Sequence, residues 1–297
     1  MTYRYRLRFL FLGAILLVFL FLWQGAALQA ATRDAMHLAA CSIIPSLFPF
    51  LVLSGILSAT ADPGVLPGSK IFARLTHLPA QGFLAFFLGA LCGFPIGARV
   101  SAELCRNGAL EKREAARLAA VSTNAGPAFV VAGVGGALFG SLALGWLLFF
   151  IQLCAALLLL PFWCKRKPPR AGREFSLPQK NFSFSEILKR AVLSALEIAG
   201  AVVFFGGVAA LLSAHLFPIP SALFKAVLEV GNGCAAAAAL GKQGLPIAAF
   251  SLGFSGISVL FQGMGELGPQ RISALPLITF KLCQGLLSAL LILPFCF

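Results

Sequence analysis

The chain is built from apolar runs that approach or reach the length of a membrane-spanning helix. A helix needs roughly 20 consecutive, predominantly apolar residues to cross the hydrocarbon core of a bilayer. Only 11% of the residues are charged, whereas charged residues make up about 25% of an average soluble domain. The sequence therefore predicts an all-α polytopic membrane protein with about seven spanning helices. The predicted spans are 9–23, 38–58, 119–140, 141–163, 191–216, 245–262 and 278–297.

A further apolar segment, 81–98, is too irregular for a simple span, because it contains Gly93, Pro95 and Gly97. Glycine and proline interrupt the hydrogen-bond ladder, and an unpaired backbone group in hydrocarbon costs several kcal/mol. Such backbone occurs at membrane depth only where protein buries it or where it lines a water-filled cavity. Basic residues flank the segment on both sides, and the positive-inside bias places both flanks in the cytoplasm. We expect a re-entrant hairpin.

The run 119–140 is interrupted in the same way by Asn124, Gly126 and Pro127. Small residues can also serve only to let membrane helices pack closely, and this is the alternative for any single glycine. Because a polar residue, a glycine and a proline fall together here, we favour a broken helix. The charged segment 110–120, just before this run, is predicted to form a short surface helix.

The second half of the chain repeats this order of segments. A plain span is followed by a short apolar segment that is interrupted at the Gly-Asn-Gly stretch beginning at Gly231, and then by a span interrupted at Gly256. Gly231 thus corresponds to Gly93, and Gly256 to Gly126. Paired broken segments at corresponding positions of two halves are typical of transporters with inverted repeats, and they mark the binding site. We therefore expect two broken or re-entrant segments in an inverted-repeat architecture.

The predicted organisation has four parts. An N-terminal signal-anchor span at 1–37 precedes a first half at 38–163, and a basic cytoplasmic loop at 164–190 separates it from a second half at 191–297. The basic residues before the first span place the N-terminus in the cytoplasm. A cleaved secretory signal is the alternative interpretation of the same N-terminal residues.

Residues at the interruptions, together with nearby polar side chains, are the candidate solute-binding groups. A carboxylate at the bilayer centre costs at least about 2.5 kcal/mol, so it is expected to be paired, protonated or in contact with water. Glu229 precedes the second interruption by two residues, where it could ligate a coupling cation or exchange a proton. Amides and hydroxyls at equivalent places in the two halves suit a small polar solute, although such groups also hold membrane helices together. The candidate set is Gly93, Pro95, Gly97, Asn124, Gly126, Pro127, Glu229, Asn232, Ser255 and Gln262.

Glu197 is a further acidic residue within an apolar run. Two interpretations remain open for it. Either it has a functional role, or it is a structural partner for Arg190 or for a neighbouring helix.

Enzyme and metal-site motifs are absent from the sequence. It contains no H-E-x-x-H, no G-x-x-x-x-G-K-[ST] and no G-x-S-x-G. The eight cysteines form no C-x-x-C pair and the three histidines are scattered, so we expect no metal site, no cofactor and no catalysis. The net charge of +13 is explained by membrane topology, and nucleic acid is not an expected partner.

Several motifs resemble those of the YlbJ group of sporulation integral membrane proteins. They are CSIIPSLFPFLVLSGIL, GFPIGARVSAEL, EAARL and NAGPAFVVAGVGG in the first half, with LEVGNG and FSGISVLFQ in the second. These proteins carry the Gate or nucleoside-recognition domain, which is similar to parts of concentrative nucleoside transporters and ferrous-iron transport proteins. The chain departs from the pattern at Thr123, where an asparagine is expected, and at Gly231, where a threonine is expected.

The resemblance implies a multi-pass membrane protein that acts in sporulation, in the formation of the spore envelope. Together with the broken segments, it favours a secondary transporter or solute-binding Gate protein of the cell membrane. Its expected partners are the lipid bilayer and a small polar solute, with coupling to a cation or a proton, and exposed apolar spans allow a homodimer. The alternative is a non-transporting structural or assembly protein of the spore membrane that holds partners through its basic segments at 99–117 and 165–189.

Overall fold

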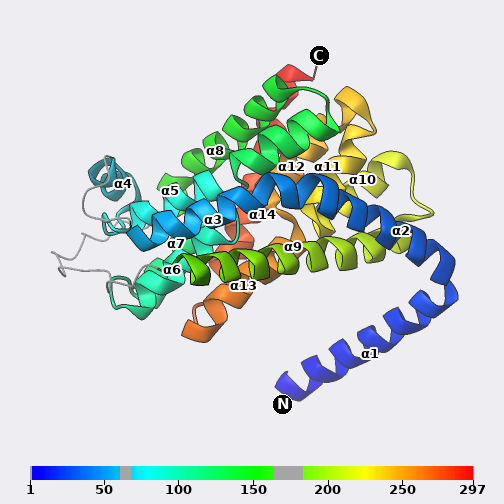
Figure 1. Cartoon of the computed structure of the whole chain (residues 1–297), viewed down its shortest axis with the longest axis horizontal. Coiled ribbons are helices and arrows are strands. Elements are labelled where there is room, and N and C mark those ends of the chain that lie inside the picture. The colour runs from blue at the N-terminus through cyan, green and yellow to red at the C-terminus, as the bar shows by residue number, and fades with distance from the viewer. Residues whose placement is uncertain (1, 61–67, 164–182, 297) are drawn as a thin grey trace.

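The computed structural model describes residues 2–60, 68–163 and 183–296. Every regular element within these ranges is a helix. The all-α membrane fold class predicted from the sequence is therefore confirmed. Figure 1 shows most of the helices packed side by side, while α1 (Thr2–Trp23) extends away from the others at the N-terminal end.

The helices that follow α1 vary widely in length. Those before the basic loop are α2 (Gly25–Leu38), η1 (Ala39–Ile43), α3 (Ile44–Thr60), α4 (Ser69–Thr76), α5 (Gly82–Cys92), α6 (Ile96–Arg106), α7 (Lys112–Ser122), η2 (Ala128–Leu138) and α8 (Leu142–Trp163). Those after it are α9 (Phe184–Ser213), α10 (Pro218–Leu228), α11 (Val230–Ala238), η3 (Gly241–Gly244), α12 (Leu245–Phe254), α13 (Gly256–Leu267), η4 (Gly268–Gln270), α14 (Leu275–Leu291) and η5 (Leu293–Phe295).

Within the described ranges, four helical stretches are long and apolar enough to cross a membrane. They are Leu142–Trp163, Phe184–Ser213, Gly241–Gln270 and Leu275–Phe295. A fifth candidate is the pair Phe11–Trp23 and Gly25–Ile43, which is bent by 98°. This count is lower than the sequence suggests, because the runs 38–58 and 119–140 are each divided between shorter helices.

Between α2 and α3 the helix widens into the π-helical turn η1, just before Pro45 and Pro49. A proline ring clashes with the carbonyl four residues earlier, and for Pro45 that carbonyl belongs to Cys41. Cys41 lies in the π-helical turn η1, whose wider winding moves the carbonyl away from the ring. The chain then continues as α3, with Pro49 inside it.

The two halves present the same order of elements on either side of the basic loop, apart from the short α4. Each half begins with a long helix and continues with two short helices that fold back on each other. A helix broken near its middle follows, and an unbroken helix closes the half. The first half uses α3, α5–α6, α7–η2 and α8, and the second uses α9, α10–α11, α12–α13 and α14.

The second hairpin turns at Glu229, and the turn predicted at the Gly-Asn-Gly stretch is wrong. Glu229 has an extended backbone, with φ −150° and ψ 131°, between α10 and α11. Gly231 and Gly233 instead belong to the first turn of α11. The reason is that the Glu229 side chain accepts a hydrogen bond from the Asn232 N–H and caps the helix at this point.

The helix predicted at 110–120 is confirmed, but its predicted place on the surface is wrong. The segment forms α7, and most of its residues from Ala115 onward are buried. Fully buried Ala115 and Ala119 leave room for α5, α6 and α14, which pack against this helix. Only the first turn is exposed, and there the Glu114 carboxylate accepts a hydrogen bond from the Glu111 N–H at 2.8 Å.

Candidate functional site

In the first half, the tip of the α5–α6 hairpin packs backbone to backbone against the break between α7 and η2. Gly93 at the tip has φ 85°, which glycine adopts at little cost and other residues rarely adopt. A Cβ on Gly93 would lie 2.9 Å from the backbone N of Gly126, and a Cβ on Gly126 would lie 2.9 Å from the N of Gly93. The two backbones therefore touch because both residues lack a side chain.

The other predicted residues of the first half support this contact. A Cβ on Gly97 would collide with the backbone carbonyl of Ser122, so the last turn of α7 fits into the hairpin. Pro95 lies at the start of α6 and Pro127 at the start of η2, where a missing N–H has no consequence for the helix.

The second half makes an equivalent contact with different residues. Ser255 and Gly256 break the helix between α12 and α13, with φ 72° and 77°. A Cβ on Gly256 would lie 3.0 Å from the N of Val230 and 3.1 Å from the Cα of Glu229, at the tip of the α10–α11 hairpin. Gly126 and Gly256 therefore occupy similar places, each against a hairpin tip.

Both hairpin tips and both broken helices meet at one small cavity, which we call the central cavity. Its volume is about 10 Å³, close to the minimum for a single water molecule. Side chains from both halves line it, among them Phe94, Phe129, Ile198, Glu229, Val259 and Gln262. In this conformation it cannot contain a solute of more than a few atoms.

Glu229 contributes a buried carboxylate to the wall of the central cavity, since the residue is only 2% exposed. Its Oε2 accepts hydrogen bonds from the Asn232 N–H at 2.6 Å and from Asn232 Nδ2 at 2.9 Å. Asn232 Nδ2 also donates to the backbone O of Val202 on α9 at 3.2 Å. The carboxylate thus caps the N-terminus of α11, where the helix dipole favours negative charge, and also places an acidic group at the cavity.

Gln262 on α13 is the other polar residue that lines the central cavity. Its Oε1 is buried and has no hydrogen-bond partner among the described residues. A buried acceptor of this kind is unusual in a native structure and is commonly satisfied by a water or a ligand. Gln262 therefore offers an acceptor to whatever enters the cavity.

Among the other polar candidates, Asn232 binds the Glu229 carboxylate, whereas Ser255 and Asn124 lie away from the cavity wall. The Ser255 hydroxyl donates back to the Leu252 carbonyl at 3.4 Å. Asn124 is completely buried behind the first break, where its Nδ2 donates to the Val121 carbonyl at 2.8 Å. The structure thus brings Glu229 and Gln262 together but separates Asn124 and Ser255 from them.

A buried polar network that the sequence analysis did not identify holds Asn124 in place. On α14, Lys281 Nζ donates to Gln284 Oε1 at 2.7 Å. Gln284 Nε2 donates to Asn124 Oδ1 and to the backbone O of Gln152, both at 2.9 Å. Gln152 Nε2 in turn donates to the Ala125 carbonyl at 2.6 Å. All four polar side chains are 0% exposed, so a lysine is linked to the broken backbone in the core of the protein.

A sequence signal for this network exists. An ionisable residue within an apolar run is a functional-site candidate by default, and Lys281 is one. The sequence analysis treated 278–297 as a plain span. The second residue of the pair, Gln284, follows three positions later on the same helix face.

A polar cleft lies one helical turn from the central cavity. This mouth cleft has a volume of about 410 Å³ and is lined by Arg99, Glu103, Arg190, Ser194, Glu197 and Glu266, among others. Arg99 on α6 forms an ion pair with Glu266 on α13, with Nε and Nη2 at 2.8 and 2.6 Å from Oε1. Glu266 follows Gln262 by four residues, or about 6 Å along the helix. The pair therefore joins the two halves next to the cavity.

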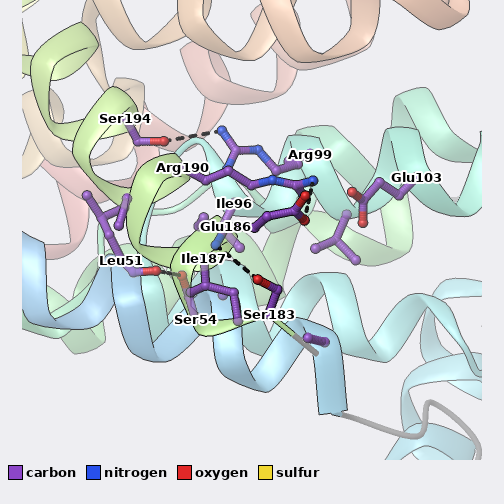
Figure 2. A pocket seen from close by; sticks show the side chains of 14 residues that line it. Leu51, Ser54, Ile96, Arg99, Glu103, Ser183, Glu186, Ile187, Arg190 and Ser194 are labelled. Atoms are coloured by element: carbon purple, nitrogen blue, oxygen red, sulfur yellow. Dashed lines mark hydrogen bonds and ion pairs between the residues drawn. The ribbon is translucent and has the colours of Figure 1, made fainter. Parts of the chain in front are cut away.

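A second hollow of about 90 Å³ adjoins the mouth cleft between α3, α6 and α9. Figure 2 shows the Arg99 guanidinium directed towards the Ser194 hydroxyl of α9, which Nη2 reaches at 3.4 Å. Arg190 lies beside it and pairs with Glu186 at 3.9 Å. Of the two interpretations of Glu197, the structural pairing with Arg190 is not found among the described residues: Glu197 is exposed, and Arg190 pairs with Glu186.

These features define a polytopic α-helical membrane protein in which two hairpin tips meet two broken helices at a shared cavity. A comparison with curated proteins finds 25% identity over 300 residues with the sporulation integral membrane protein YlbJ of Bacillus subtilis strain 168, covering 84% of this chain and 73% of that protein. The resemblance carried by the sequence motifs is thus confirmed: the chain is similar to YlbJ over most of its length. No family model matches the chain, and no solved structure matches it.

Proposed function

We propose that this protein is a secondary transporter or solute-binding Gate protein that acts in spore envelope formation. We place it in the cell membrane as a multi-pass protein with its N-terminus in the cytoplasm. The single observation that supports the proposal most is the convergence of both hairpin tips and both helix breaks on a cavity that contains Glu229. Broken helices from two related halves form the substrate sites of many secondary transporters.

The proposed solute is small and polar, because Glu229 and the free Gln262 Oε1 are the polar groups of the central cavity. Glu229 is also the proposed site of a coupling cation or of proton exchange. A volume of about 10 Å³ holds no more than one water, so this conformation is closed. Solute entry requires a hairpin tip to move away from the break that it contacts.

The Arg99–Glu266 pair supports a path from the mouth cleft. The pair links α6 in the first half to α13 in the second, so separation of the halves must break it. Both side chains retain about a quarter of their exposure, 28% and 25%, and a pair of this kind contributes only about 0.2–1 kcal/mol. The ion pair can therefore keep the path from the mouth cleft closed, while breaking it requires little free energy.

The second candidate is a non-transporting assembly protein of the spore membrane, and one observation favours it. The Glu229 carboxylate is already occupied as the cap of α11, and the cavity beside it is very small. In that case the polar core would serve only to hold the fold together, and the basic segments of the chain would bind partners.

A thermal-shift experiment on detergent-purified protein separates the two candidates. The panel contains nucleosides, amino acids, dicarboxylates, inorganic anions and divalent metals, each tested on the wild type, Glu229→Gln and Gln262→Ala. Glu186→Gln is the matched control, because it makes the same chemical change on an exposed carboxylate. A ligand at a hundred times its dissociation constant stabilises the folded state by about 2.7 kcal/mol.

A compound that stabilises the wild type and the control, but not the two cavity variants, would support a solute site at the central cavity. Stabilisation that persists in both cavity variants would place the binding site elsewhere. No stabilisation by any compound would favour the assembly protein.

A further inference from the structure

Among the described residues, Lys281 is a buried basic residue without an acidic partner. The residue is 0% exposed, and its Nζ has one hydrogen-bond acceptor within the described ranges, the Gln284 Oε1 at 2.7 Å. A lysine ammonium has three protons to donate. Charged groups in protein interiors are normally paired with an opposite charge, so the absence of such a partner here needs an explanation.

The helices around Lys281 supply no nearby carboxylate. α14 packs against α7, α8 and α12. α12 has no ionisable residue, and the ionisable residue of α8 is Cys154, which is exposed. The acidic residue of α7, Glu114, is in the first turn, at the opposite end of that helix from Asn124, and its carboxylate is bonded to the Glu111 N–H.

The hydrogen bonds that begin at Lys281 lead instead to uncharged oxygens at the end of α7. Through Gln284 and Asn124 the network reaches the Val121 carbonyl, in the last turn of the helix. Two further oxygens from the elements around this network, Gln152 Oε1 and Ser122 Oγ, are buried and have no hydrogen-bond partner in the part of the chain that the structure describes. The C-terminus of a helix carries a partial negative charge. In transporters, such C-termini and unwound carbonyls coordinate monovalent cations.

We infer that the Lys281 ammonium occupies a monovalent-cation position at the end of α7, so that the chain itself supplies the cation that a sodium or potassium ion would otherwise provide. No group of three or more His, Cys, Asp or Glu side chains in the described part of the chain could hold a metal ion. The ligand that Nζ reaches at this position is the Gln284 amide oxygen. The consequence for coupling rests on the proposed function. A transporter with a tethered cation at this position does not need sodium there, and the charge of the position changes only when Nζ gains or loses a proton.

The competing explanation is that Lys281 merely fills space in the core. A buried charge with a purely structural role can often be replaced by an apolar side chain of similar size without loss of stability. Methionine is unbranched and close to lysine in length. Lys281→Met therefore keeps the packing and removes the charge, whereas Lys281→Ala removes both and leaves room for a small cation.

The experiment measures the unfolding temperature of the wild type, Lys281→Ala and Lys281→Met without any solute. Each protein is tested in choline chloride, sodium chloride, potassium chloride and methylammonium chloride at equal ionic strength. We expect the wild type to be equally stable in all four salts. Lys281→Ala should unfold at a lower temperature in choline chloride. Its unfolding temperature should then rise with the concentration of sodium, potassium or methylammonium, as mass action requires for a bound cation. Lys281→Met should be less stable than the wild type in every salt and should not respond to the cation.

The inference is overturned if Lys281→Ala is equally stable in all four salts, or if the wild type itself is stabilised by sodium or potassium. If Lys281→Ala does not fold in any salt, Lys281→Met decides the question. An unfolding temperature at or above that of the wild type overturns the inference, and a lower one supports it. Because no solute is present, failure here leaves the proposed solute site untouched, and failure of the solute screen leaves the cation position untouched.

Discussion

The two helix breaks each pack against a hairpin tip, but they have opposite charges next to them. At the first break, the end of α7 is connected through Asn124 and Gln284 to the amine of Lys281. At the second hairpin tip, the start of α11 is capped by the carboxylate of Glu229. A basic group is thus linked through two side chains to a helix C-terminus, and an acidic group lies at a helix N-terminus. Each has the sign that the helix dipole favours.

The difference shows that the shared shape of the halves does not require shared side chains. Gly126 and Gly256 both contact a hairpin tip, and glycine is needed wherever two backbones approach so closely. The polar group that compensates the open helix end is free to differ between the halves. A protein with one fixed basic group and one fixed acidic group in its core can respond differently at its two breaks.

The largest effect on folding is expected from adding a side chain to the glycines where the backbone of each hairpin touches a neighbouring helix. A side chain on Gly97 collides with the Ser122 carbonyl, and one on Gly233 collides with the backbone of Ala226. We expect Gly97→Val and Gly233→Val each to remove the monodisperse protein peak in size-exclusion chromatography in detergent. Gly200→Val is the control, because no atom of the described residues lies within 4 Å of a Cβ at that position. If Gly97→Val and Gly233→Val both fold, the close backbone contacts do not determine how the hairpins pack.

The next largest effect is expected at the first break. Gln284→Leu removes the hydrogen-bond acceptor of Lys281 and a donor to Asn124. Leaving a charged group unsatisfied in the core should lower the free energy of unfolding by about 3 kcal/mol or more. Gln284→Glu is the matched variant, since it keeps an acceptor beside Lys281 and should be more stable than Gln284→Leu. Equal unfolding temperatures for the two variants would contradict a charged Lys281.

A smaller effect is expected at the second hairpin tip. Glu229→Ala removes the cap of α11 and should lower the free energy of unfolding by about 1–2 kcal/mol, as loss of a helix cap usually does. Glu229→Gln keeps an acceptor for the Asn232 N–H and should lose less. Chemical denaturation of both variants in detergent measures the difference. If Glu229→Gln is as unstable as Glu229→Ala, the charge of Glu229 matters to the fold beyond its role as a cap.

The glycines and prolines of the sequence predicted the helix breaks well. One break lies at a different residue than predicted, because a side chain caps the helix there. Gly93, Gly126 and Gly256 lie at interruptions because no other residue allows two backbones to come so close, and this requirement is visible in the sequence. The second hairpin turns at Glu229, because a carboxylate that can cap a helix fixes its start more strongly than a nearby glycine does. Sequence spacing alone does not reveal which of the two residues determines the turn.

Only part of the candidate site could be predicted from the sequence, because some of its contacts depend on local breaks and others on helix packing. Glu229 and Gln262 lie together because their helices are broken at corresponding places. Asn124 belongs to a different polar environment, which is formed with Gln152 on α8 and Gln284 on α14. Those contacts join residues far apart in the chain, so they depend on how the helices pack. The ion pair of Arg99 with Glu266 spans a still longer sequence distance and could not be predicted from local pattern.

The smallest effect is expected where the two halves meet at the mouth cleft. Arg99→Gln and Glu266→Gln should each change the free energy of unfolding by about 1 kcal/mol or less, because the pair keeps contact with solvent. The double variant should show a coupling energy of about 0.2–1 kcal/mol, and salt should reduce it because exposed charges are screened. Denaturation of the four proteins at low and high ionic strength measures this. A coupling energy that is much larger and insensitive to salt would mean that Arg99 and Glu266 form a fixed joint between the halves. The α6 and α13 helices would then move together as one unit, and opening would have to occur at a hairpin tip.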